Sequence, residues 1–153
     1  MRILEVEQIR ETFHLMTRRL GLIDKCGCKI SEPDLSVVQS HILYEINKRK
    51  GPSMQEVADA LGMDITTFSR QVQTLVKLEL VAKMEQPEDR RVNMLSLTET
   101  GLQAVTEISE QMNRYFQEVF SYMTEFEKET VIRSIHLLNR SLAQSSVCCS
   151  PVR

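Results

Sequence analysis

The sequence predicts a mainly α-helical protein that carries one small β-hairpin. Apolar residues recur at alternating spacings of three and four in its first segment and again in its second half, which is the period of an amphipathic helix. Near the middle of the 153 residues the pattern changes to alternation, which is typical of strands. Hydrophobic residues make up 42% of the chain, enough for a core, and no apolar run is long enough to span a membrane. The N-terminus carries charges where a signal peptide would be apolar, so we expect a soluble, cytoplasmic protein.

Long helical segments are predicted near both ends of the chain. The first carries its apolar stripe over residues 6–23. The second begins after Thr98, which we expect to cap it, and continues to about Tyr122. A last helix follows a capping box formed by Thr124 and Glu127. Because these apolar stripes are wider than one small core needs, we expect a subunit interface.

A helix of medium length is predicted from about Leu35 to Lys48. Asp34 is expected to cap it, and the Gly51-Pro52 pair to end it. Its inward face is expected to consist of Leu35, Val38, Ile42 and Ile46.

The next segment predicts two short helices joined by a tight turn. Ser53 and Glu56 form a capping box for the first, and Gly62 ends it. Asp64 caps the second, which continues to about Leu78. This arrangement is a helix-turn-helix. Four apolar residues of its second helix are expected to pack in the core: Phe68, Val72, Leu75 and Val76.

A β-hairpin is predicted directly after the helix-turn-helix. Its strands are Val81–Glu85 and Asn93–Leu97, and the polar segment between them forms the tip. A helix-turn-helix followed by such a hairpin is a winged helix.

With these elements in place, the chain resembles the MarR family of bacterial transcription regulators. The likeness is most specific in Met54–Gly101, where MQEVADALGMDITTFSRQVQTLVKLELV resembles the family's helix-turn-helix and PEDRRVNMLSLTETG its wing. The wing's Asp-x-Arg pattern falls at Asp89 and Arg91. The sequence departs from the family at Glu79, where glycine is usual, and at Thr74, where a basic residue is common.

The resemblance implies a homodimer of two-part subunits. Residues 1–30 and 99–147 would form a helical dimerisation domain, residues 34–98 a winged helix-turn-helix that binds DNA, and residues 148–153 a tail. Each winged helix would bind one half-site of a pseudo-palindromic operator. The net charge of −2 gives no general attraction to nucleic acid, so binding would depend on local groups.

In a helix-turn-helix the second helix lies in the major groove. Here its polar side chains offer hydrogen bonds to base edges: Thr66, Thr67, Ser69, Arg70 and Gln73. Arg70 could pair with guanine and Gln73 with adenine. Ser53 and Lys83 are weaker candidates for phosphate contacts. The alternative is an ordinary solvated face on a winged helix that contacts only proteins.

The tip of the hairpin carries Arg90 and Arg91, and narrow minor grooves attract arginine. The resemblance implies that Arg91 enters the groove and that Asp89 orients it.

Sequence motifs of enzymes are missing. The chain has no Walker loop, GxGxxG, HExxH or GxSxG pattern, and its histidines are scattered. We therefore expect a regulator and not an enzyme, with no required cofactor.

The four cysteines form two close pairs, Cys26 with Cys28 and Cys148 with Cys149. Their spacing does not match common structural zinc sites, but it suits a soft metal or metalloid ion or a redox switch. The resemblance places the first and last helices of different subunits side by side, so the two pairs could meet across the interface. The expected function is a repressor released by an inducer at these thiols.

Two alternatives to thiol sensing remain open. A small phenolic or aromatic ligand could bind between the domains and release DNA, with the cysteines incidental. His41 is a weaker candidate ligand for a metal, because QSHIL resembles the corresponding stretch of zinc-sensing members of the family.

Overall fold

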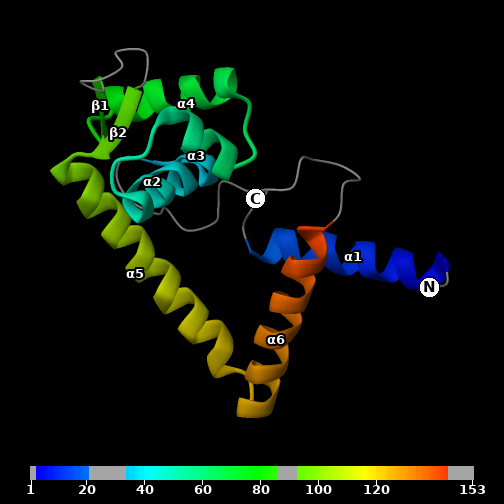
Figure 1. Ribbon diagram of the computed structural model, residues 1–153. Helices are drawn as coiled ribbons and strands as arrows, with labels where there is room; N and C mark the ends of the chain where they lie inside the picture. The colour runs from blue at the N-terminus through cyan, green and yellow to red at the C-terminus, as the bar shows by residue number, and fades with distance from the viewer. Residues whose placement is uncertain (1–2, 21–33, 86–92, 145–153) are drawn as a thin grey trace.

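The computed structural model describes residues 3–20, 34–85 and 93–144. The described part is mainly helical with one antiparallel hairpin, which confirms the predicted fold class (Figure 1). The elements in chain order are α1 (Ile3–Arg19), α2 (Val37–Arg49), α3 (Met54–Ala60), α4 (Ile65–Lys77), β1 (Val81–Glu85), β2 (Asn93–Leu97), α5 (Glu99–Ser121) and α6 (Glu125–Leu142).

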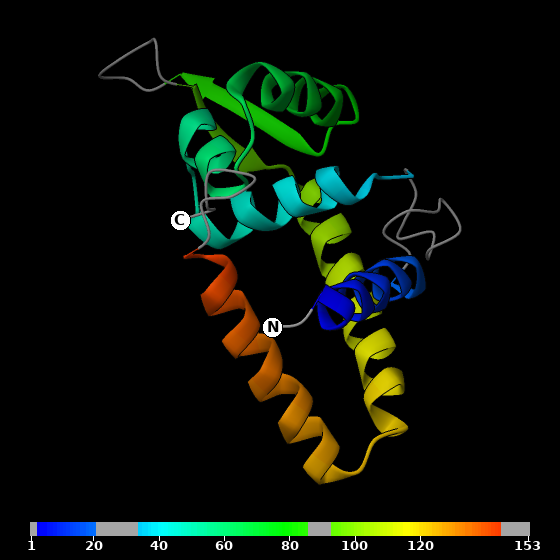
Figure 2. The same cartoon turned by 90° about the vertical axis from the view of Figure 1, so that its right-hand side faces the viewer.

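The elements form a compact body with a helical arm. Figures 1 and 2 show α2, α3, α4 and the hairpin gathered together, with α5 leading out of this body and α6 folding back toward it. We call the distal part of α5 together with α6 the arm. The arm extends far beyond the part of α5 that packs against the body.

In the part of the chain that the structure describes, the core lies within the compact body and the first turns of α5. Its largest fully buried side chains are Phe68, Ile42, Leu43, Ile46, Leu75, Leu80, Leu95, Val57 and Val72. The first turns of α5 complete it with Ala104 and Val105, which are also buried. The winged helix therefore has a hydrophobic core of its own.

The start of α2 differs from the prediction. Ser36, not Asp34, caps the helix: its hydroxyl accepts the Gln39 N–H at 3.2 Å, and Gln39 Oε1 accepts the Ser36 N–H at 3.0 Å. The inward face also turns toward Leu43, which is fully buried, whereas Val38 is 41% exposed. The buried face of α2 packs against α5, β2, α3 and α4.

The helix-turn-helix follows the prediction closely. Ser53 and Glu56 form the capping box of α3, and Asp64 caps α4. Phe68, Val72 and Leu75 are fully buried, as predicted, but Val76 is 37% exposed. It is one residue beyond Leu75, and this extra rotation of about 100° takes it off the inward face.

The hairpin has the predicted strands and is tied to the start of α3. Its pairing runs from Val81 opposite Leu97 to Glu85 opposite Asn93. The Leu95 N–H donates to the Pro52 carbonyl at 2.7 Å, next to an isolated bridge between Ser53 and Met94. The wing and the helix-turn-helix therefore form one unit.

The turn after α4 contains a backbone conformation that favours glycine. Glu79 has φ 59°, in the left-handed region, at the position where the resemblance led us to expect glycine.

Glu79→Gly is expected to raise the free energy of unfolding by about 1 kcal/mol, because glycine adopts this conformation without the steric penalty of a Cβ. Urea unfolding monitored by circular dichroism measures the change. Glu79→Ala is the control, because it removes the charge and keeps the Cβ. Equal stability of the two variants would contradict the backbone explanation.

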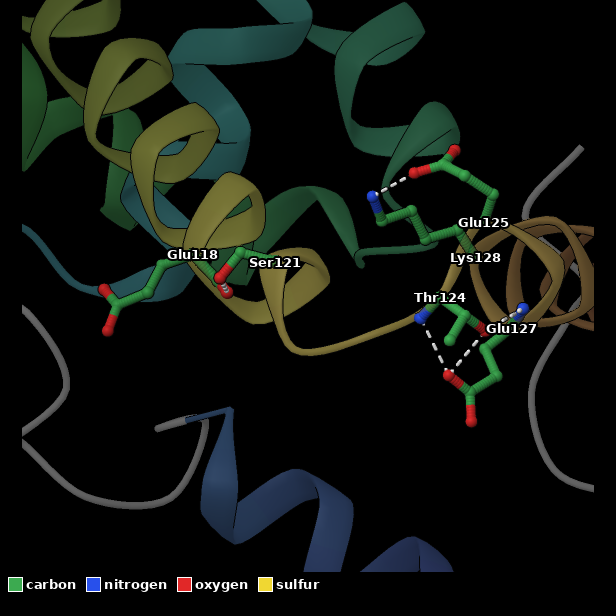
Figure 3. Close-up of polar contacts among 6 residues, drawn as sticks. All are labelled: Glu118, Ser121, Thr124, Glu125, Glu127 and Lys128. Carbon is green, nitrogen blue, oxygen red and sulfur yellow. Dashed lines mark hydrogen bonds and ion pairs between the residues drawn. The ribbon is translucent and has the colours of Figure 1, made fainter.

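The turn between α5 and α6 has the predicted capping box. Figure 3 shows the Glu127 carboxylate accepting the Thr124 N–H and hydroxyl, each at 2.8 Å, while the Thr124 hydroxyl accepts the Glu127 N–H at 3.3 Å. The hydrogen bond from the Thr124 backbone lowers the pKa of Glu127 below its usual value, and the Thr124 side chain adds to the effect. The carboxylate therefore stays ionised at the positive end of α6, which favours the sharp reversal of the chain.

Candidate nucleic-acid interface

One face of α4 is polar and open to solvent. Thr66, Arg70 and Gln73 are exposed, and the helical period places them opposite the buried Phe68 and Val72. Because the buried face is fixed in the core, the rotation of α4 is fixed as well. The outward side chains therefore project together from a rigid helix.

The first turn of α4 is organised by Asp64. Its Oδ1 accepts the Thr67 N–H at 2.9 Å. Hydrogen bonds from the Thr67 side chain and then from its backbone N–H lower the pKa of Asp64 below its usual value.

Ser69 lies away from the line of the other predicted contacts. It is half-buried on the flank of α4 that also carries the exposed Ile65 and Val76. The helical period separates it from Arg70 by about 100°. It is thus placed beside the polar face and not at its centre.

Lys77 is a candidate that the sequence analysis missed. It is exposed, and its spacing of four residues from Gln73 and seven from Arg70 places it on the same face of α4. A helical wheel of α4 would have shown Lys77 on the face opposite Phe68 and Val72. A cation at the end of this face suits a phosphate contact.

The weaker phosphate candidates are both accessible. The Ser53 hydroxyl accepts the Glu56 N–H at 3.2 Å, and the Ser53 N–H donates to Glu56 Oε2 at 2.7 Å. These hydrogen bonds, from the Ser53 backbone first and then its side chain, lower the pKa of Glu56. The Ser53 hydroxyl is therefore engaged within the cap, toward both the N–H and the carboxylate of Glu56. Lys83 is exposed on β1.

Several predicted site residues lie outside the described residues: Asp89, Arg90 and Arg91 of the wing, and the cysteines Cys26, Cys28, Cys148 and Cys149. His41 is exposed on α2. Residues 3–20, 34–85 and 93–144 contain no cluster of three or more His, Cys, Asp or Glu side chains that could hold a metal ion. In the same ranges, no helix combines the length and the apolarity that crossing a bilayer requires.

The fold and the exposed polar face of α4 define a winged helix-turn-helix protein. The sequence model described as MarR family matches residues 34–92, which include α2, α3, α4 and β1. The curated relatives include the HTH-type transcriptional repressor IacR of Pseudomonas putida, 27% identical over 109 residues that cover 71% of this chain and 65% of that protein. They also include the uncharacterized HTH-type transcriptional regulator YxaD of Bacillus subtilis, 29% identical over 138 residues that cover 89% of this chain and 94% of that protein.

Solved structures share the fold. FabT of Streptococcus pneumoniae, crystallised in complex with DNA, superimposes with a TM-score of 0.80 at 19% identity, over 90% of this chain and 96% of that chain. Together with the family match over residues 34–92, these findings show that the winged helix-turn-helix segment is similar to the MarR family and that most of the chain shares the fold of such proteins. Its relatives are named as transcriptional regulators, which confirms the prediction of a regulator and not an enzyme.

Proposed function

We propose that the protein is a homodimeric transcription regulator that binds a pseudo-palindromic DNA operator through α4. The observation that carries the proposal is the polar outward face of α4, held in place by the fully buried Phe68, Val72 and Leu75 on its other side. The helix is exposed along the whole of that face, as entry into a major groove requires. Similarity of residues 34–92 to a family of winged-helix regulators and the DNA-bound state of the FabT structure support the proposal.

The chemistry of the face suits direct reading of bases. Arg70 can donate two hydrogen bonds to guanine O6 and N7, and Gln73 can pair with adenine N6 and N7. Thr66 at the start of the helix can donate, accept or place its methyl against that of thymine. Lys77 at the far end, with Ser53 and Lys83, would contact phosphates and fix the register. Arg91 of the wing, oriented by Asp89 and next to Arg90, would enter the minor groove.

The dimer is proposed from the apolar surface outside the core. α6 has no buried residue, although it carries a stripe of Val131, Ile135, Leu138 and Leu142 along one side. α1 exposes a similar stripe of Val6, Ile9, Phe13, Met16 and Leu20. Isolated helices of this length are marginal in water, and apolar surfaces this extended mark interfaces. A second copy of the chain would cover both stripes, and residues 1–30 and 99–147 would form the dimerisation domain.

Arg70→Ala tests the docking. It should weaken binding to the DNA upstream of the protein's own gene by about 1–3 kcal/mol, roughly 5- to 150-fold, and relax base preference at one position of each half-site. Gel shifts over a protein titration measure the affinity. Arg114→Ala is the matched control, because it removes the same charge from a side chain of α5 that is 69% exposed, far from α4.

Equal loss in both variants would assign the effect to net charge and would contradict reading by α4. Failure of the wild-type protein to bind any duplex in a selection from genomic DNA would reject the regulator altogether.

We further propose that an inducer acts at the thiols of Cys26, Cys28, Cys148 and Cys149. The first pair follows α1 and the second follows α6 within a few residues. α6 turns back from the end of α5 and diverges from it, so the end of α6 returns toward the level of the winged helix (Figure 2). Joining the pairs through a soft metalloid or a disulfide would tie the arm to the start of the winged helix. That would change the separation of the two recognition helices, which the DNA fixes.

Cys26→Ser combined with Cys28→Ser should keep DNA binding and lose release by trivalent arsenicals or peroxide. Cys148→Ser combined with Cys149→Ser should weaken the same response. The measurement is DNA release against inducer concentration, with a phenolic compound as a parallel arm. If both double variants still released DNA at the same arsenical or peroxide concentrations as the wild type, the proposal that the cysteines sense the inducer would be wrong. Release by the phenolic compound would then favour an organic ligand bound between the domains.

A further inference from the structure

Hydrogen bonds of one residue, Thr98, connect the turn after α4 to the start of α5. The Thr98 hydroxyl donates to the Glu79 carbonyl at 2.6 Å and accepts the Gly101 N–H at 2.9 Å. The Thr98 N–H also donates to the Leu80 carbonyl at 3.1 Å. The same residue thus caps α5 and holds both carbonyls of the turn that ends the recognition helix.

The turn is equally constrained on the side of α4. The Glu79 N–H donates to the Val76 carbonyl and the Leu80 N–H to the Leu75 carbonyl, each at 3.0 Å. The left-handed φ of Glu79 aims its carbonyl at Thr98. No flexible segment therefore separates the last turn of α4 from Thr98.

Close packing reinforces the hydrogen bonds. A Cβ built on Gly101 would lie 1.9 Å from the Leu80 carbonyl oxygen, so the backbone of α5 rests directly on the turn. The hairpin closes the arrangement, because Val81 pairs with Leu97 immediately before Thr98. A change in the tilt of α5 would therefore also move the end of α4.

We propose that Thr98 is a positioning residue that fixes the orientation of the recognition helix relative to the arm. The inference rests on the proposed function, in which two such helices must meet two successive major grooves. Since the arm carries the subunit contacts, the hydrogen bond from Thr98 to Glu79 links the geometry of the dimer to the spacing of the two α4 helices. This hydrogen bond orients α4 relative to α5, whereas the cap that Thr98 also forms stabilises α5 alone.

Three substitutions separate the two roles. Thr98→Ser keeps the cap and the donor. Thr98→Asp keeps a favourable cap for Gly101 but cannot donate to the Glu79 carbonyl, because a carboxylate only accepts. Thr98→Val loses both. Ser36→Ala is the matched control, because it removes a cap of similar geometry from α2 without touching the turn after α4.

The orientation is measured by the distance between spin labels on Lys77 of α4 and Glu118 of α5, both exposed. The labels are attached to unnatural amino acids, so the native cysteines stay intact. Labelled chains are diluted with unlabelled ones, so the distance is taken within one subunit. Figure 3 shows the Glu118 side chain directed away from α6. DNA affinity is measured separately on unlabelled variants.

We expect narrow distance distributions for the wild type, Thr98→Ser and Ser36→Ala, and broadened ones for Thr98→Asp and Thr98→Val. DNA affinity should fall about tenfold in the two broadened variants, the effect of one hydrogen bond, and stay unchanged in Thr98→Ser and Ser36→Ala. Ser36→Ala should lower the melting temperature all the same.

A wild-type distribution and affinity in Thr98→Asp would overturn the proposal, as would broadening of the same size in Ser36→Ala. Should the wild type bind no DNA, the proposed function fails, whereas the distance measurement still decides the role of Thr98.

Discussion

Ile135→Asp is expected to separate the protein into monomers at concentrations where the wild type is a dimer. Ile135 lies on the apolar stripe of α6 and is 47% exposed in the single chain. In the proposed dimer it is covered, and each interface would bury an unpaired carboxylate from each subunit. A penalty of about 2 kcal/mol per carboxylate would raise the dissociation constant roughly a thousandfold. Sedimentation velocity over a concentration series measures it.

His136→Asp provides a closely matched control for that experiment. It introduces the same side chain at the neighbouring position, which the helical period turns about 100° away from the stripe. This variant should remain dimeric. Dissociation of both variants to the same extent, or a wild type that is monomeric at micromolar concentration, would contradict an interface on this side of α6.

Gly101→Ala should destabilise the winged helix by about 3 kcal/mol, the upper range for overpacking. The added Cβ would lie 1.9 Å from the Leu80 oxygen, and that atom belongs to backbone held by Thr98 and the hairpin. The sign of the change in the free energy of unfolding is informative, because replacing glycine by alanine in an ordinary helix interior stabilises a protein by up to about 1 kcal/mol. Urea unfolding monitored by circular dichroism measures the free energy.

Gly51→Ala is the comparison for the second prediction. Gly51 has a φ of 86° but no atom within 4 Å of the built Cβ. Gly51→Ala should therefore lower the free energy of unfolding by only about 1 kcal/mol, the cost of placing a Cβ on a left-handed backbone. If Gly101→Ala proved as stable as the wild type, the close approach of α5 to the turn would be disproved.

Local chemistry made much of the fold predictable. The caps at Ser53, Asp64, Thr98 and Thr124 depend on hydrogen bonds between residues three apart, which a sequence displays directly. The strand bounds followed from alternation flanked by a polar segment. Features decided by tertiary packing were harder to predict.

The differences from the prediction have both local and tertiary causes. Ser36 and Asp34 are both competent caps, and the capping box that Ser36 forms with Gln39, three residues later, favours Ser36. Packing of α2 against its neighbours buries Leu43 in place of Val38. The link from Thr98 to Glu79 spans 19 residues of sequence, a separation at which no spacing rule applies. In the candidate interface, the period of α4 was sufficient to find Arg70, and it would also have found Lys77.

The continuous core has a consequence for the order in which the protein folds. Among the residues whose burial the structure describes, all the buried apolar side chains lie between Leu35 and Val105, and none of them belongs to α1 or α6. Domains fold as units during synthesis, so the winged helix can form while α6 is still being made. If the chain dimerises as proposed, refolding should separate into a fast phase that is independent of chain concentration and a later phase whose rate rises with chain concentration. A chain with α6 removed would complete the first phase and never enter the second.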